Sequence, residues 1–214
     1  MKFIRKYKYY LSLVAVLFLV VTCMTIEEII HPDNAQVDSD INITVKIKIV
    51  AETDGNSKLT FGILMPKAWN VKDNALLTLT TDAAFAGNKV TNEPMVLMSA
   101  ADKNPTDGMP WSASFQSRMG VLGNTGPMEW VVFKSVTTFQ INDNIPDQKT
   151  VVGTVNIKLH TGSRAVKFYA GYTFCGEAFG FNGEKYPDED VVEAKLLEVT
   201  GGDDPQMDFT ADPA

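Results

Sequence analysis

The chain has 214 residues, of which 45% are hydrophobic, 10% aromatic and 21% charged. This length and composition are typical of one or two globular domains, and they exclude collagen-like, coiled-coil and wholly disordered chains. The net charge is −7, and an acidic protein repels phosphate backbones, so nucleic acid is not expected as a partner.

Residues 1–22 have the pattern of a secretory signal peptide. Four basic residues and no acidic residue lie within residues 1–8, and the apolar run 11–21 follows them. Such a run is shorter than the ~20 residues that a transmembrane helix needs, but it suits the central region of a signal peptide. An uncleaved membrane anchor is the alternative interpretation.

Cys23 ends a Leu-Val-Val-Thr-Cys stretch that resembles the lipobox of bacterial lipoproteins. Thr22 departs from that pattern, in which Gly, Ala or Ser usually precedes the cysteine. The resemblance implies that Cys23 becomes the lipidated first residue and that its acyl chains anchor the protein to a membrane. Glu27 and Glu28 resemble a surface-export signal, or they form the exposed side of a first strand. Cys175 would then have no disulfide partner, and we expect a half-buried structural thiol.

The remaining chain reads as β-strands separated by turns. The clearest is 41–50, where apolar and polar residues alternate as in a half-buried antiparallel strand. No segment has the pattern of a long amphipathic helix, although 82–92 could hold one or two turns. The sequence predicts an all-β fold, an immunoglobulin-like antiparallel β-sandwich with a long inserted loop. The other predicted strands are 58–65, 75–81, 94–99, 129–133, 136–141, 150–160, 165–174 and 191–199.

These patterns divide the chain into four parts. The signal peptide, 1–22, precedes a lipidated N-terminus, tether and first strand at 23–37, and the sandwich domain follows at 38–200. Residues 201–214 are acidic and rich in Gly and Pro, which predicts a disordered tail. Within the sandwich, 100–127 holds three Pro and four Gly with little periodicity. Long loops in compact domains are usually functional or mobile, so we place the working rim there.

The lipobox-like Cys23, the His31-Pro32 linker, the 41–50 strand and the 59–69 segment together give a family resemblance. They look like the β-sandwich domain of Bacteroidetes cell-surface lipoproteins, which tend to belong to glycan-utilisation systems of the starch-utilisation type. The resemblance implies a lipid anchor in the outer membrane, facing the cell surface. It implies an accessory role with polysaccharide or outer-membrane glycan-import proteins as partners, and it transfers no functional residue.

Catalytic chemistry is not indicated by any motif. The two histidines, His31 and His160, lie in no metal or triad pattern, and HExxH and GxSxG are absent from the sequence. We therefore predict no catalytic residue, no metal ligand and no cofactor. Two acidic segments, 142–147 and 188–190, leave open a structural calcium or a glycosidase-like carboxylate pair, although solvated surface charge is the better explanation.

Aromatic side chains are the better candidates for ligand contact, because sugars stack their apolar faces on aromatic rings. Anchoring of loops to the core is the alternative role for such rings. Trp130 is different, since its strand-like surroundings predict packing between the two sheets. The candidate ligand-binding residues are Trp69, Trp111, Phe179, Phe181 and Tyr186.

The sequence thus predicts a non-enzymatic, lipid-anchored outer-membrane accessory module for binding or assembly. A surface glycan-binding protein of a polysaccharide-utilisation system is one alternative. A pilus or adhesion subunit is another, in which a strand is exchanged between subunits. The segments 26–30 and 191–199 would be the exchangeable strands.

Overall fold

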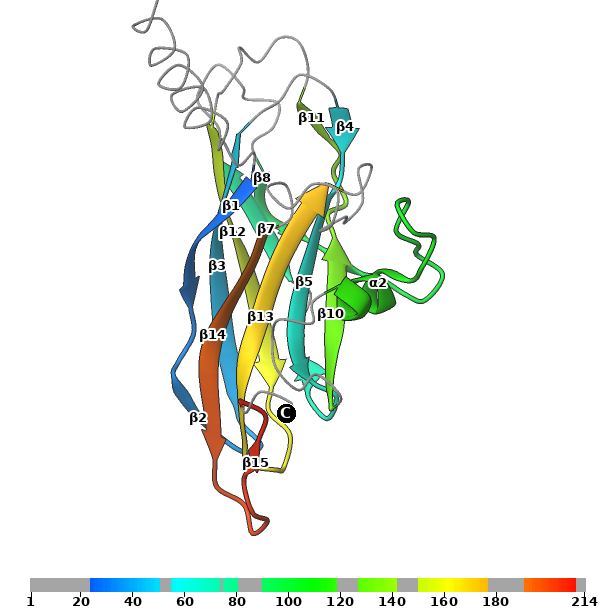
Figure 1. Cartoon of the computed structure of the whole chain (residues 1–214). Coiled ribbons are helices and arrows are strands. Elements are labelled where there is room, and N and C mark those ends of the chain that lie inside the picture. The colour runs from blue at the N-terminus through cyan, green and yellow to red at the C-terminus, as the bar shows by residue number, and fades with distance from the viewer. Residues whose placement is uncertain are drawn as a thin grey trace, which may run out of the picture.

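The computed structural model describes residues 24–50, 55–73, 75–80, 90–118, 127–141, 150–176 and 191–210. The predictions for the signal peptide and for Cys23 lie outside these residues. So do Phe179, Phe181 and Tyr186, and nearly all of the 82–92 segment and the two acidic segments. Within the described residues the chain forms two sheets that lie face to face (Figure 1).

The first sheet is antiparallel throughout. Its strands, in spatial order, are β1 (Met24–Ile30), β3 (Asp40–Val50), β12 (Thr150–His160), β7 (Leu76–Thr80) and β8 (Val90–Pro94), with β6 (Asn70–Val71) also paired to β12. The longest pairing joins β3 to β12 over the full length of both strands. The predicted 41–50 and 150–160 strands are therefore confirmed and lie side by side.

The second sheet is mixed, because its two short strands β2 and β15 pair in parallel. In spatial order it contains β2 (Asn34–Gln36), β14 (Val191–Thr200), β13 (Val166–Gly176), β5 (Leu59–Pro66), β10 (Met128–Lys134) and β9 (Val96–Leu97), with β15 (Met207–Asp208) paired to β13. A separate ribbon pairs β4 (Gly55–Ser57) with β11 (Phe139–Ile141).

The strand order confirms the predicted immunoglobulin-like sandwich. Seven strands form the frame of the sandwich. Four of them lie in the first sheet in the order β1-β3-β12-β7, and three lie in the second sheet in the order β14-β13-β5. This is the four-and-three arrangement of the immunoglobulin fold. Everything between β7 and β12 is an insertion into that frame, which carries β8, β9, the helix α2 (Trp111–Arg118), β10 and β11. The predicted long insertion is therefore present.

The core lies between the two sheets and is filled by the inward-facing side chains of their strands. In β3 the side chains of Ile41, Ile43, Val45 and Ile47 are buried, while Asn42 and Lys46 between them are exposed. Burying one such side chain contributes about 1.5–3 kcal/mol, so this face is a main source of stability. The second sheet faces them with the buried side chains of Phe61, Ile63, Phe168, Tyr172 and Phe174.

The outer face of β5 and β10 is buried as well, which corrects the expected position of Trp130. All eight residues of β5 are buried, because one face of the strand packs in the core and Phe115 of α2 lies over Gly62 on the other. Trp130 lies on the same side of the sheet as Gly62, and its ring packs against Phe115 of α2 with centroids 5.5 Å apart. The tryptophan is therefore buried beneath the helix and does not lie between the sheets.

Residues 201–210 belong to the fold, in contrast to the predicted disordered tail. β5 pairs with β13 only from Gly171 onward, which leaves the first residues of β13 open on that side. β15 occupies this position, with Met207 opposite Val166 and with the amide of Phe209 donating to Lys167 O at 2.8 Å. Met207 and Phe209 pack against the core, and these two apolar residues explain why an acidic segment is ordered.

α2 is the helix of the described region, and it is only eight residues long. In the described part of the chain, no helix has the length and apolar character that crossing a membrane requires.

Candidate binding groove

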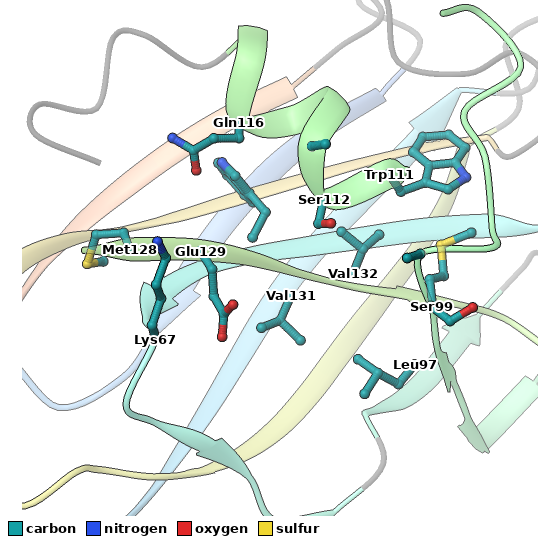
Figure 2. A pocket seen from close by; sticks show the side chains of 14 residues that line it. Lys67, Leu97, Ser99, Trp111, Ser112, Gln116, Met128, Glu129, Val131 and Val132 are labelled. Atoms are coloured by element: carbon teal, nitrogen blue, oxygen red, sulfur yellow. The ribbon is translucent and has the colours of Figure 1, made fainter. Parts of the chain in front are cut away.

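The insertion builds a groove along the edge of the second sheet (Figure 2). Its volume is about 460 Å³. One wall is α2, the floor is β10, and the segment that follows β9 closes one end. The lining residues are Lys67, Leu97, Met98, Ser99, Ala100, Trp111, Ser112, Ala113, Gln116, Met128, Glu129, Trp130, Val131 and Val132.

β10 lies at the groove because it is only partly covered at its outer edge. It pairs with β5 along all seven of its residues, from Met128 to Lys134. On the other side β9 pairs only with Phe133 and Lys134. One further hydrogen bond, from Met98 N to Val132 O at 2.8 Å, ends this contact. The rest of the β10 edge faces the groove.

Aromatic packing holds α2 in place over the sheet. Trp111 and Phe115 lie one helical turn apart, and their ring centroids are 5.7 Å apart in an edge-to-face arrangement. Phe115 makes a second edge-to-face contact with Trp130. Gly62 makes this possible, since a Cβ at that position would lie 2.5 Å from the Phe115 ring. The helix therefore approaches the sheet more closely than a larger residue at position 62 would permit.

A hydrogen-bonded loop precedes the helix and fixes its start. The buried side chain of Asn104 donates to Ser114 Oγ at 2.7 Å, and that hydroxyl donates to Asp107 Oδ2 at 2.7 Å. Asn104 and Asp107 also accept hydrogen bonds from the amides of Thr106 and Met109. The predicted irregular loop at 100–127 thus begins as a braced turn and continues as a helix.

An ion pair fixes the end wall of the groove. Lys134 Nζ lies 2.8 Å from Asp102 Oδ1, and both side chains are about one-quarter exposed. Asp102 Oδ2 also accepts hydrogen bonds from the amide and hydroxyl of Ser99. Lys134, and then the Ser99 amide, lower the pKa of Asp102 to about 2. The carboxylate therefore ties the segment after β9 to β10 at neutral pH.

The lining is apolar along most of its length and polar at its rims. Lys67 and Glu129 lie together at one end, and Ser112 and Gln116 of α2 line the upper side (Figure 2). Leu97 and Val131 form the lower side, and Leu97 is 53% exposed. Concave sites of this kind, with an apolar lining and a few polar groups, suit ligand binding.

Of the aromatic residues predicted to contact a ligand, the structure describes Trp69 and Trp111. Trp69 and Trp111 are 4% and 1% exposed, so neither ring offers a free face, and this burial argues against sugar stacking on them. Trp69 packs edge-on against Phe168 at 5.3 Å. Trp111 contributes to the groove wall. Both rings serve as core anchors in this structure, while ligand contact by Phe179, Phe181 and Tyr186 stays a prediction.

The two segments proposed as exchangeable strands are both used within this chain. β1 pairs with β3, and β14 pairs with β13 from Val191 to Val199. Exchange of either one between subunits would first require breaking these pairings.

The sequence reasoning missed the helix and most of the groove. Trp111 and Phe115 lie four residues apart, and this helical spacing of two large apolar residues is the sequence signal that could have revealed α2. Leu97, Glu129 and Val131 show no such spacing. They line one groove only because β9, α2 and β10, which are separate in the sequence, pack together. The residues that the structure describes contain no cluster of His, Cys, Asp and Glu that could hold a metal ion.

Comparison with known proteins gives one family and several distant structures. The model of a family described as a domain of unknown function (DUF4961) matches residues 24–213. No curated protein is significantly similar to the chain.

Three solved structures illustrate the distant likeness. The major pilin BcpA of Bacillus cereus is 9% identical with a TM-score of 0.38, and the match covers 80% of this chain but 39% of the pilin. The major pilin SpaD of Corynebacterium diphtheriae is 6% identical with a TM-score of 0.40, covering 83% and 33% of the two chains. A cohesin module from Clostridium perfringens is 10% identical with a TM-score of 0.35, covering 80% and 93%.

Proposed function

Because the chain belongs to the DUF4961 family, whose description names no activity, we propose a function from the groove itself. The protein is a non-enzymatic accessory module that is held at the cell surface by a lipid and that binds a partner in this groove. The observation that carries the proposal is the origin of the groove in the insertion between β7 and β12.

The insertion adds a groove to a sandwich that is complete without it. Seven strands already form the immunoglobulin-like sandwich. The inserted segment adds the edge strand β9, the helix α2 and the strand β10, and each of these contributes lining residues, while the braced loop holds the helix in place. Binding residues are often carried by such additions to a rigid scaffold, because the scaffold then fixes their geometry.

Binding, and not catalysis, is the role that suits the lining. Its apolar side chains include Leu97, Val131 and Val132, and its polar groups lie at the rims. An apolar groove gains affinity from burial of apolar surface, while the rim groups select the orientation of the ligand.

The cell-surface address rests on the sequence. The basic and apolar pattern of residues 1–22 is that of a secretory signal, and Cys23 follows it in a lipobox-like stretch. Acyl chains on Cys23 would hold the folded domain at a membrane, because each buried methylene contributes ~0.8 kcal/mol. The outer membrane is the site that the resemblance to Bacteroidetes lipoproteins supports.

Site-specific photo-crosslinking in cells that express the full chain tests this function. A photoreactive residue replaces Ser112, which lines the groove, or Ser117, which lies on the same helix, is exposed and does not line it. We expect a discrete adduct from position 112 that is absent from position 117. Equal labelling from both positions, or no adduct from position 112, would contradict a binding role for the groove. An adduct with polysaccharide would favour the glycan-binding alternative.

A further inference from the structure

We propose that the groove receives an extended polypeptide strand, which adds to the second sheet along the edge of β10. This inference rests on the proposed function and specifies the chemical class of the partner.

The direction of the main-chain groups in β10 is the first step. Lys67 N donates to Pro127 O at 3.2 Å, and Ser135 N donates to Leu59 O at 2.9 Å. The odd-numbered residues of this strand therefore direct their main-chain groups towards β5. In an antiparallel pair the groups of alternate residues point to opposite sides. The N–H and C=O of Met128, Trp130 and Val132 thus point towards the groove.

The second step is that β9 uses only one end of this edge. Its pairing reaches Phe133 and Lys134, and Met98 N donates a hydrogen bond to Val132 O. The chain then leaves the sheet in the turn that begins at Ser99. Among the described residues, none pairs with Met128 or Trp130 on this side. A strand in the groove would continue, along the same edge, the ladder that β9 begins.

The third step concerns what Met128 and Trp130 offer to a partner. Both residues line the groove, yet their exposed fractions are only 3%. The Trp130 ring is packed against Phe115. Because these side chains are packed, what the two residues can offer a partner strand is the main-chain donors and acceptors that point away from β5. An extended polypeptide supplies the complementary alternation, which is how peptides add to sheet edges.

The two walls of the groove would contact the side chains of such a strand and select among them. Figure 2 shows Val131 and Leu97 on one side of β10 and the helix residues Ser112 and Gln116 on the other. Successive side chains of an added strand point alternately to these two sides. The exposed Leu97 and the half-buried Val131 favour apolar residues on their side. The rim residue Glu129 adds polar selection at one end.

The test uses a phage-displayed library of random peptides, selected on the full chain held in lipid nanodiscs. The selected peptides are then resynthesised with single N-methyl groups on successive main-chain nitrogens. An added strand bonds through alternate residues, so binding should be lost on N-methylation of alternate positions and kept at the positions between them. A peptide held by side chains alone would show no such alternation, and that result would overturn the proposal.

Two lysine substitutions locate the site. Leu97→Lys places a charge in the lower wall, and Val152→Lys is the matched control on β12, where the valine is 42% exposed. We expect Leu97→Lys to weaken peptide binding about tenfold or more, as loss of an apolar anchor does, and Val152→Lys to leave it unchanged. Both residues are exposed, so folding should persist, which circular dichroism checks. Unchanged binding in Leu97→Lys would overturn the proposal.

The crosslinking experiment separates this inference from the proposed function. Adducts from position 112 combined with a failed peptide selection would retain a binding groove and reject a polypeptide strand as its occupant. If a second copy of this chain competes with the peptides for the groove, the strand comes from the protein itself.

Discussion

Individual side chains at the helix–sheet contact set the shape of the groove. Gly62→Ala places a Cβ 2.5 Å from the Phe115 ring, so either the helix or the strand must move. We expect a loss of about 1–3 kcal/mol in unfolding free energy, the usual cost of overpacking. Urea denaturation followed by tryptophan fluorescence measures this loss.

The same substitution in a Phe115→Ala background provides the control. Removing the ring removes the clash, so Gly62→Ala should cost much less there, and the two substitutions should be strongly coupled. An equal cost in both backgrounds would contradict close approach of the helix to Gly62.

The Asp102 carboxylate gives the end wall a defined pH dependence. Its pKa in the folded protein is about 2, below its ordinary value of 3.8, chiefly because of the hydrogen bond from Lys134. A lowered pKa contributes stability that is present above pH 3.8 and is lost as the pH falls towards 2. Exposure to solvent keeps this contribution small.

We therefore expect the stability difference between the wild type and Asp102→Asn to be constant near neutral pH and to shrink as the pH falls from about 4 to 2. Denaturant titrations at a series of pH values measure this difference. Asp203→Asn, which removes an exposed carboxylate outside the insertion, controls for general acid effects. A difference that does not depend on pH would contradict the role given to the ion pair.

At the scale of elements, the helix depends on the polar bracing of the loop before it. Ser114→Ala removes the acceptor for the buried Asn104 amide and the donor to Asp107. A buried group left without its partner costs about 1–3 kcal/mol. We expect faster amide exchange throughout α2 in this variant, measured by hydrogen–deuterium exchange. Ser117→Ala, at an exposed position on the same helix, should change little, and equal effects would contradict the bracing role.

Strand elements were predictable where one face is buried and the other is solvated. β3 alternates between the two, and its pattern gave the strand directly. β5 is buried on both faces, so its alternation is lost, and the sequence could not reveal that a helix covers it. Trp130 was misplaced for the same reason, because its burial comes from α2 and not from the opposite sheet.

Short elements and the groove depend on partners that sequence periodicity does not report. β15 contains two residues, and it is ordered because β5 leaves the start of β13 open. The groove combines residues near 67, 97–100, 111–116 and 128–132. Local patterns in the sequence predict a functional rim at 100–127, which overlaps one wall of the groove but omits its floor in β10.

At the scale of the whole molecule, the membrane anchor that we propose rests on a single side chain. Cys23→Ala removes the thiol that a lipid would be attached to. We expect the variant to lack lipid and to leave the membrane fraction, as shown by metabolic labelling with a fatty acid and by fractionation. Cys175→Ala, which alters the other cysteine, should remain lipidated and membrane-bound. A membrane fraction unchanged by Cys23→Ala would contradict the lipid anchor.

The central claim is that the inserted segment forms the binding site of a cell-surface module. Amide hydrogen exchange of the full chain in the membranes that contain its partners, compared with the purified full chain, tests it most directly. We expect slower exchange in the membranes confined to 97–100, 111–118 and 128–132, with 41–49 and 150–160 unchanged. Equal exchange in both samples, or protection centred on the first sheet, would contradict it.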